Sequence, residues 1–498
     1  MWKKILPALI ILTAVLALYH PTLTTFFSQD DFFHFKVSQT DGSLKGFFNL
    51  FGFYSFQERG IAFYRPISRE VPYNLYYSLF GLNHLPFRIF SFLLHFLNIY
   101  LLYIFTQRMF QDKNLSFFVS FFFGITAANV AMLYYLAGGI QTLLATTFTL
   151  ASLVFFHNYL HTKHLKSGIL TFISFLLAIA SHEQAVIIPF LLAGLTLILK
   201  SIKDFKKYFL TLLPFTIVTL LLLLVDIFKI GFSSNEQQYQ AVFDLKTTIN
   251  SFSWYTSWAL GVPETLIDFV FPGLKLNPTL IRYWGNYYRF IFPSFFLSII
   301  LITFSTVYLF IKNREFFAKK RFLFYLIWYP IGLLPVILLP LHKSTHYLTI
   351  VLPAFWTLIG LISFGFYHEF GKVRINLSKI IFSLLIISLL ILSSASAILG
   401  STNYWAATRG KMAKKLIKNV MDTYPNLPKG ANIYFKNDPT YPKLTAEWGT
   451  SSKQANTILN GSDALQLLYK DSTLQAYYED VKKPTTLLDI FPITAKLY

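Results

Sequence analysis

One apolar stretch decides how many times this chain crosses a membrane: GILTFISFLLAIASHEQAVIIPFLLAGLTLIL, residues 168–199. It can form one long broken helix, or two short helices that meet at Ser181-His182-Glu183-Gln184. A membrane span needs roughly 20 mostly apolar residues, so each half is short by itself. The choice matters because every later span reverses its direction if the stretch is one helix and not two.

The basic residues favour two helices, because cytoplasmic segments of membrane proteins are enriched in Lys and Arg. With a cytoplasmic N-terminus and two helices here, most Lys and Arg between the spans fall on the inner side, and Lys343 is the exception in the short outer turns. One merged helix would move the later clusters outside. The expected inner residues are Lys3, Lys4, Arg108, Lys113, Lys163, Lys166, Lys200, Lys203, Lys206, Lys207, Lys312, Arg314, Lys319, Lys320, Arg321, Lys372, Arg374 and Lys379.

The rest of the chain contains further apolar segments of the same kind. Hydrophobic residues make up 54% of the 498 positions and charged residues 13%, whereas soluble proteins have about a quarter charged. The sequence therefore predicts an all-α polytopic protein with about eleven transmembrane helices, in the plasma (inner) membrane. The predicted spans are 5–27, 87–106, 115–136, 138–160, 168–181, 185–199, 208–230, 291–311, 322–341, 347–367 and 380–400.

The first span also resembles a secretory signal peptide, but no small-residue cleavage site precedes Gln29, which favours a retained helix. Residues 1–400 form the predicted transmembrane domain. It has two long outer loops, 28–86 and 231–290. Residues 401–498 form a predicted soluble C-terminal domain.

The C-terminal domain combines helical and strand patterns. Residues 411–424 are amphipathic, residues 432–435 have a strand pattern and residues 464–469 a helical one, which predicts a small α/β domain. We expect this domain to be extracytoplasmic. The basic residues after the last span, Arg409 among them, would fit the inner side better, but long domains cross the membrane largely regardless of charge.

An acidic pair follows the first span, in Ser28-Gln29-Asp30-Asp31-Phe32-Phe33-His34. Neighbouring carboxylates such as Asp30 and Asp31 can provide a general base or hold a divalent cation such as Mg²⁺ or Mn²⁺. His34 can support either role. The alternative is that these polar residues only end the span. The chain has no cysteine, which excludes thiolate metal sites and cysteine nucleophiles.

A lone acid, Glu183, stands at the turn of the stretch quoted above, and no other acid occurs between Leu115 and Leu199. Ionisable groups at membrane depth are costly and mark functional sites by default. We therefore predict a catalytic role for Glu183, with His182 supporting it. The alternative is a carboxylate that caps a helix N-terminus.

The first outer loop also carries two arginines, in Tyr64-Arg65-Pro66 and at Arg69. Guanidinium groups bind phosphate in a forked geometry, so these residues are candidates for a lipid-linked phosphate. An ion pair within the loop is an equal alternative, since its five acids balance its five bases. In the second span, His95 and Asn98 are more often hydrogen-bond partners between helices than ligands.

The last candidate is the turn His342-Lys343-Ser344-Thr345-His346-Tyr347. Lys343 can bind a phosphate, with His346 beside it. The alternative is a lysine that extends to the membrane interface. His342 and His346 could also ligate a metal, although such pairs are common without one.

The order of these features resembles the GT-C superfamily of polytopic glycosyltransferases, and within it the protein O-mannosyltransferase-like branch. The resemblance covers about residues 1–360. His182 departs from it, because related proteins often carry Lys there, and so does the late turn, where Arg-Tyr is more typical. The matching residues are Asp30 and Asp31, Tyr64-Arg65-Pro66, His95 and Asn98, and His182-Glu183.

The resemblance implies a hexosyl- or mannosyltransferase that moves a sugar from a polyprenyl-phosphate carrier to a protein, lipid or glycan acceptor. Its partners would be that donor, the acceptor and membrane lipid, with no nucleic acid. The resemblance fixes no cofactor, and the divalent cation that Asp30 and Asp31 could hold is the one candidate. Asp30 or Asp31 would be the general base, and Arg65 and Lys343 would stabilise the departing phosphate. The alternatives are a polymerase or ligase of lipid-linked polysaccharides, a transporter or flippase, and a non-catalytic assembly protein.

Overall fold

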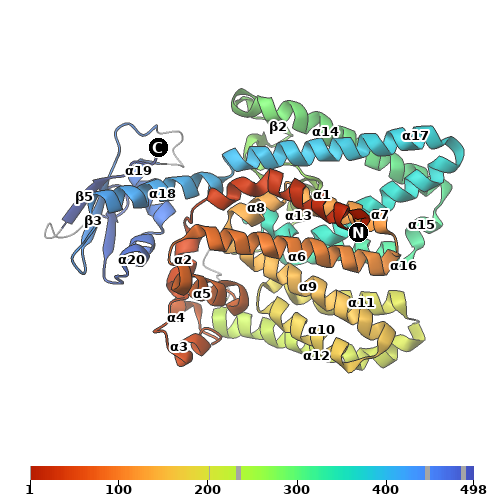
Figure 1. The fold of residues 1–498 in the computed structure, drawn as a ribbon, viewed down its shortest axis with the longest axis horizontal. Helices are drawn as coiled ribbons and strands as arrows, with labels where there is room; N and C mark the ends of the chain where they lie inside the picture. Colours follow the sequence, from red (N-terminus) through yellow and green to blue (C-terminus); the bar gives the residue numbers. More distant parts are fainter. Residues whose placement is uncertain (1, 201, 232–236, 443–448, 484–489) are drawn as a thin grey trace.

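The computed structural model describes residues 2–200, 202–231, 237–442, 449–483 and 490–498. Figure 1 shows a long bundle of helices with a small α/β domain at one end, which we call the domain end. Within the described residues, seven helical segments are long and apolar enough to cross a membrane, which makes the chain a multi-pass membrane protein. They are α1 (Trp2–Tyr19) with η1 (His20–Thr24), α6 (His84–Phe110), α9 (Leu136–Thr162), α12 (Ile202–Val225) with η4 (Asp226–Gly231), α14 (Pro278–Lys312), α16 (Lys320–Ile337) and α17 (Leu352–Asn403).

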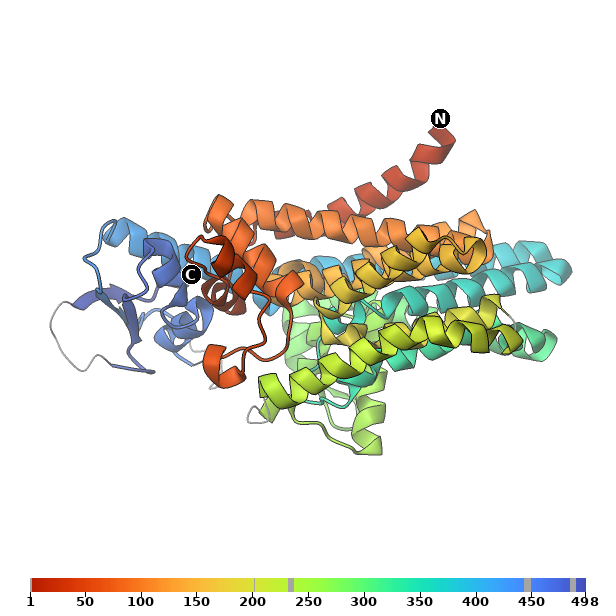
Figure 2. The ribbon, with the colours of Figure 1, turned by 90° about the horizontal axis from the view of Figure 1, so that it is seen from below.

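Three shorter apolar helices complete the bundle: α7 (Lys113–Ile125), α10 (Leu165–Ile179) and α11 (Ile188–Leu199). Each of the eleven predicted spans therefore overlaps an apolar helix, provided that α17 is counted as two arms. Figure 2 shows that α1 leans away from the other helices toward its N-terminal end.

The long helix α17 turns back on itself at Arg374, whose backbone is not helical (φ −144°, ψ 76°). Phe364 in the first arm and Phe382 in the second face each other, with ring centroids 5.2 Å apart. The two arms therefore lie side by side, and the predicted spans 347–367 and 380–400 are confirmed as separate segments.

The stretch 168–199 forms two helices, as the basic residues predicted. The helix α10 ends at Ile179, and a short turn, η3 (Glu183–Ile187), leads into α11. Nδ1 of His182 accepts a hydrogen bond from the backbone N–H of Gln184 (3.2 Å), which caps this turn. The break in the helix leaves Glu183 between two spans.

The predicted span 115–136 is shorter than expected, because α7 ends at Ile125 and the short helix α8 (Asn129–Tyr134) follows after a break. The side chain of Asn129 donates hydrogen bonds to the carbonyls of Phe123 (2.8 Å) and Gly124 (3.1 Å). In a continuing helix, these carbonyls would accept hydrogen bonds from backbone N–H groups of the next turn. A polar side chain within an apolar run thus ends the helix.

The C-terminal end of α6 and the N-terminal end of α16, which carry Arg108 and Lys320 of the expected inner residues, lie at the end of the bundle opposite the domain end (Figure 1). Nη1 of Arg108 donates to Oδ1 of Asn158 (2.8 Å), and Nζ of Lys320 donates to the carbonyl of Leu197 (3.2 Å). These contacts join α6 to α9 and α16 to α11. The two contacts thus hold neighbouring helices together at this end of the bundle.

The two long loops at the domain end are largely helical. In the second of them, Oδ1 of Asn277 accepts from the backbone N–H of Thr279 (3.0 Å), so α14 starts at Pro278 and not near residue 291. The first loop contains α2 (Asp30–Val37), α3 (Leu44–Asn49), α4 (Phe56–Arg59), η2 (Pro66–Glu70) and α5 (Val71–Phe80). The second contains η5 (Gln237–Tyr239), α13 (Leu245–Leu260), η6 (Glu264–Phe269) and the antiparallel strands β1 (Val270–Phe271) and β2 (Lys275–Leu276), while α15 (Glu315–Ala318) and η7 (Thr345–Leu348) lie in later connections.

The C-terminal segment forms the expected small α/β domain. Its three strands are parallel, in the order β4-β3-β5. Phe435 of the central strand is buried and stacks on Tyr478, with ring centroids 5.0 Å apart. The elements are α18 (Trp405–Thr423), β3 (Asn432–Lys436), α19 (Ser451–Leu459), α20 (Asp463–Tyr469), β4 (Gln475–Tyr478) and β5 (Ile490–Thr494).

The α/β domain contacts the first long loop. Nζ of Lys36 donates to Oε1 of Gln466 (2.5 Å), and the hydroxyl of Tyr77 donates to the carbonyl of Leu467 (2.8 Å). The helix α18 follows α17 and carries the chain out of the bundle (Figure 1). The acidic pair and the C-terminal domain therefore lie at the same end of the molecule.

Candidate active site

The two neighbouring acids at the start of α2 have different surroundings, and Asp31 is the enclosed one. Its side chain accepts hydrogen bonds from the backbone N–H of Ser28 (3.1 Å) and the hydroxyl of Tyr73 (3.2 Å). Burial raises the pKa of Asp31 from 3.8 to about 6, although the nearby positive charge of Arg88 opposes the shift. Asp31 is thus placed to hold the loop together.

The other acid, Asp30, is half-buried and faces α8 and α9. The hydroxyl of Tyr135 donates to its Oδ2 (2.5 Å). The guanidinium of Arg409, from α18, attracts Asp30 electrostatically. Of the two acids, Asp30 is the less buried one.

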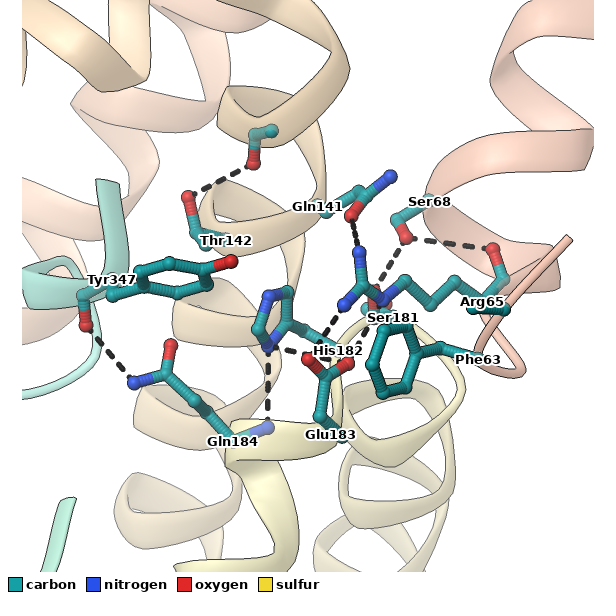
Figure 3. A network of polar contacts seen from close by, with 12 residues as sticks. Phe63, Arg65, Ser68, Gln141, Thr142, Ser181, His182, Glu183, Gln184 and Tyr347 are labelled. Carbon is teal, nitrogen blue, oxygen red and sulfur yellow. Dashed lines mark hydrogen bonds and ion pairs between the residues drawn. The ribbon is translucent and has the colours of Figure 1, made fainter. Parts of the chain in front are cut away.

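The second part of the site is a closed ion pair between Arg65 and Glu183 (Figure 3). Nε of Arg65 donates to Oε2 of Glu183 (2.8 Å), and Nη2 donates to Oε1 (2.5 Å). Nη1 donates to the side-chain carbonyl of Gln141. The hydroxyl of Ser68 donates to the carbonyl of Ser181 (2.5 Å), which ties η2 to the turn before Glu183. All three guanidinium nitrogens of Arg65 thus have partners within the protein.

A run of rings connects the two parts of the site. The ring of Tyr135 lies 5.7 Å from that of His346, which lies 4.0 Å from Tyr347. Tyr347 in turn lies 5.9 Å from His182, whose Nδ1 is 3.7 Å from the Glu183 carboxylate (Figure 3). Residues from four separate parts of the sequence therefore form one continuous chain of contacts from Asp30 to Glu183, and His182, His346 and Tyr347 within it are buried.

The late turn is held by an acid that the sequence did not single out, Glu264. Its Oε2 accepts hydrogen bonds from the backbone N–H and the hydroxyl of Thr345 (both 2.6 Å) and from the hydroxyl of Ser344 (3.1 Å). That hydroxyl lies 2.9 Å from Nδ1 of His346. Glu264 thereby orients His346, and burial lowers the pKa of this histidine, which favours its neutral form.

Other candidates have structural contacts. Arg69 is buried, pairs with Glu70 (2.8 Å) and donates to the carbonyls of Ala62 and Phe63. Arg69 therefore takes part in an ion pair within the loop, which is the alternative that the sequence left open, and its role toward a phosphate stays a prediction. The hydroxyl of Tyr64 donates to the carbonyl of Phe51 (3.1 Å), which also fixes the loop.

The histidines and the asparagine behind the site pack within the protein. His34 is buried with its ring 5.2 Å from that of Tyr73, and burial lowers its pKa. Nε2 of His95 lies 3.0 Å from the carbonyl of Gly124. The side chain of Asn98 donates to the carbonyl of Leu143 (3.1 Å). The interpretation of His95 and Asn98 as hydrogen-bond partners between helices is confirmed.

Lys343 is half-buried, which lowers its pKa, and its Nζ donates a long hydrogen bond to Asn250 (3.4 Å). Within the described part of the chain, no three His, Asp or Glu side chains gather as metal ligands would. Asp30 and Asp31 have different hydrogen-bond partners, the hydroxyls of Tyr135 and Tyr73.

An apolar groove of about 950 Å³ runs between α10 and α12 beside the ion pair. Tyr64 and Ala180, which line one end of it, are next in sequence to Arg65 and Ser181. Lys229 also lines the groove and is exposed. The remaining lining residues are Phe53, Leu176, Ile179, Val218, Leu221, Leu222, Leu224, Val225 and Phe228.

Several site residues carried weak sequence signals. Gln141 is a lone amide in the apolar start of α9, which could have marked it. Tyr135 and Arg409 had no signal, because aromatic residues are abundant in this chain and basic residues are frequent after its last span. Glu264 follows a proline in a long loop, and nothing local links it to the turn that it holds.

No protein-family model matches the sequence, and no curated protein matches it. Among solved structures, the fold is similar to the archaeal oligosaccharyltransferase AglB from Archaeoglobus fulgidus, determined in complex with an inhibitory peptide and a dolichol-phosphate. The sequence identity is 12% and the TM-score 0.45, over 88% of this chain and 63% of that chain. The chain thus spans less than two thirds of the length of AglB. A likeness of this size assigns neither an activity nor a substrate to this protein.

Proposed function

We propose that this protein is a membrane glycosyltransferase of the GT-C type, which moves a sugar from a polyprenyl-phosphate carrier to an acceptor at the outer face of the membrane. The observation that carries the proposal is the position of Asp30. This half-buried carboxylate accepts a hydrogen bond from Tyr135 at one end of a mostly buried chain of polar and aromatic contacts, and an Arg65–Glu183 pair beside an apolar groove forms the other end. A base near an acceptor and a cationic site near a lipid groove are what such a transfer needs.

In the proposed reaction, Asp30 accepts the proton of an acceptor hydroxyl as its oxygen bonds to the anomeric carbon of the sugar. The bond from that carbon to the phosphate oxygen breaks, and its electron pair stays with the lipid phosphate. Nearby cationic groups would stabilise the added negative charge. Lys343, which is half-buried with its pKa lowered, and the exposed Lys229 are candidates beside Arg65.

The closed pair sets a condition on phosphate binding. Arg65 already donates to Glu183 and Gln141. A phosphate would have to share this guanidinium with Glu183 or displace it. We infer that Glu183 keeps the guanidinium of Arg65 paired and in position until the phosphate of the donor binds.

The apolar groove between α10 and α12 suits the isoprenoid tail of the donor, because its walls are mainly aliphatic and aromatic side chains. Tyr64 lines the groove and is next in sequence to Arg65, so a lipid in the groove would bring its phosphate toward the pair. A branched, unsaturated hydrocarbon chain gains favourable contacts with such walls.

The alternatives share parts of this chemistry. A polymerase or ligase would use a lipid-linked glycan and differ mainly in donor and acceptor. A transporter or flippase would favour charges in mid-membrane, whereas the paired charges of this site lie at the domain end of the bundle.

The test is to give the purified full-length protein separate radiolabelled donors, namely polyprenyl-phosphate monosaccharides and polyprenyl-diphosphate oligosaccharides. We expect consumption of a monophosphate-linked sugar, with loss of that activity in Asp30→Asn. Consumption of the diphosphate-linked glycans alone would identify a polymerase or ligase. Movement of intact lipid across vesicles, without sugar transfer, would identify a flippase.

A further inference from the structure

We propose that the C-terminal domain is part of the active site, and that Arg409 of α18 is a positioning residue for Asp30. This inference rests on the proposed function, because it assigns Asp30 a catalytic task. It goes further by making the α/β domain a component of the catalytic centre and not an appended module.

The segment that leads into Asp30 is held from both sides. On the bundle side, the guanidinium of Arg88 donates to the carbonyls of Thr25 (3.0 Å) and Phe26 (3.3 Å). On the domain side, the backbone N–H of Gln29 donates to the carbonyl of Ile458 in α19 (2.8 Å). The position of Asp30 therefore depends on both parts of the molecule.

The backbone of Gln29 shows how closely this segment is constrained. Its φ is 57° and its ψ −117°, a backbone conformation that residues other than glycine rarely adopt. Such a conformation persists only where surrounding contacts hold it. The holding contacts come from the C-terminal domain, because Nη1 of Arg409 donates to Oε1 of Gln29 (2.6 Å), in addition to the backbone bond to Ile458.

The helix α18 approaches the segment closely enough to require a glycine. A Cβ atom at Gly410 would lie 2.6 Å from the carbonyl oxygen of Phe26 and 2.8 Å from Cγ2 of Thr25. Because Gly410 has no side chain, α18 can approach this backbone closely enough for the neighbouring Arg409 to reach Gln29. The domain thus packs directly on the backbone that precedes the acid.

Arg409 also completes a ring of contacts around Asp30. Its guanidinium lies 5.2 Å from the ring centroid of Trp405, and Trp405 lies 5.0 Å from Tyr135, the residue that donates to Asp30. The charged and titratable groups around Asp30 include Arg409 from α18, Tyr135 from the α8–α9 junction, Tyr73 from α5 and Asp31 on its own helix. Arg409 is the cation among them.

The test compares Arg409→Gln with Arg409→Lys, and Lys411→Gln serves as the matched control. Lys411 is exposed on the same helix, two residues away and on another face. We expect Arg409→Gln to lower sugar transfer at least about tenfold, since hydrogen bonds to charged groups are among the stronger ones. The acidic limb of its pH–rate profile should move to higher pH, because a carboxylate that loses a neighbouring cation ionises less readily. Arg409→Lys should restore most of the rate and the original pH profile.

A second measurement does not depend on any transfer activity. The chain has no cysteine, so single cysteines at the exposed positions Gln39 and Lys453 can carry spin labels on the loop and the domain. We expect one narrow distance distribution in the otherwise unchanged protein and in Lys411→Gln, and a broader one in Arg409→Gln. If Arg409→Gln does not fold, Gln29→Ala removes the same contact without removing a charge.

The outcomes separate the two proposals. If no polyprenyl-linked sugar is transferred but Arg409→Gln broadens the distances, the positioning contact stands and the proposed function fails. If transfer occurs and Arg409→Gln changes neither the pH profile nor the distances, the positioning role is overturned. A loss of activity in Arg409→Gln that Arg409→Lys does not restore, with unchanged distances, would also overturn it.

Discussion

The two parts of the candidate site are related to the sequence in opposite ways. Asp30 and Asp31 are adjacent, yet one is enclosed with Tyr73 and Ser28 while the other faces Tyr135. Arg65 and Glu183 are 118 positions apart, yet they form the tightest ion pair of the site. Adjacency therefore does not give two residues the same role, and a shared role does not need adjacency. The partner of each charge is set by the helices that meet around it.

The largest expected effect separates the two adjacent acids. Asp30→Asn removes the proposed base and should lower sugar transfer by about a thousandfold, within the range typical of general-base catalysis. Asp31→Asn is the matched control and should keep far more activity, because Asp31 is buried and hydrogen-bonded to Ser28 and Tyr73 within the loop. Transfer rates of the two variants, at equal amounts of folded protein, make the comparison. Equal losses in both would contradict different roles for the pair.

The second effect concerns stability and pH, and again distinguishes Asp31. Burial raises its pKa from 3.8 to about 6, a difference that corresponds to roughly 3 kcal/mol in the free energy of unfolding. Since the folded-state value is the higher one, this contribution is complete below pH 4 and is lost as the pH rises through 6. Denaturation of the wild type and of Asp31→Asn between pH 3.5 and 7.5 should show the wild type losing stability relative to the variant. A difference in unfolding free energy between the two proteins that stays constant across that range would contradict a raised pKa of Asp31.

The smallest expected effect is the coupling between Arg65 and Glu183. Their side chains are 13% and 22% exposed, so removal of one partner leaves a partly buried charge without its main counter-ion. A cycle of Arg65→Gln, Glu183→Gln and the double variant should give a coupling of about 2 kcal/mol in unfolding free energy. The double variant should be more stable than the sum of the single losses implies. Additive single effects would show that the pair is only a contact and not an energetic unit.

Much of the membrane architecture could be predicted. Each predicted span overlaps an apolar helix, and the turn at Ser181–Gln184 and the reversal at Arg374 are where the sequence placed them. Boundaries failed at polar residues: Asn129 ends a helix early, and Asn277 starts one early. Hydropathy averages over many residues and does not register a single side chain that caps a helix.

The site was predicted less completely. Asp30, Arg65, Glu183 and His346 do come together at the domain end. The sequence could not tell which acid is enclosed, nor that Arg65 is already paired. It also did not identify Glu264 or Arg409, because each acts on a segment that is distant in the chain.

The sequence by itself determined that the chain crosses a membrane many times and where its turns fall, because a bilayer requires long apolar segments and charge disfavours burial in it. Only the tertiary structure decided which partner each charged side chain has. A charge near an apolar interior has few polar groups within reach, and packing alone sets which those are. For Asp30 the packing provides Tyr135 from the bundle and Arg409 from the C-terminal domain.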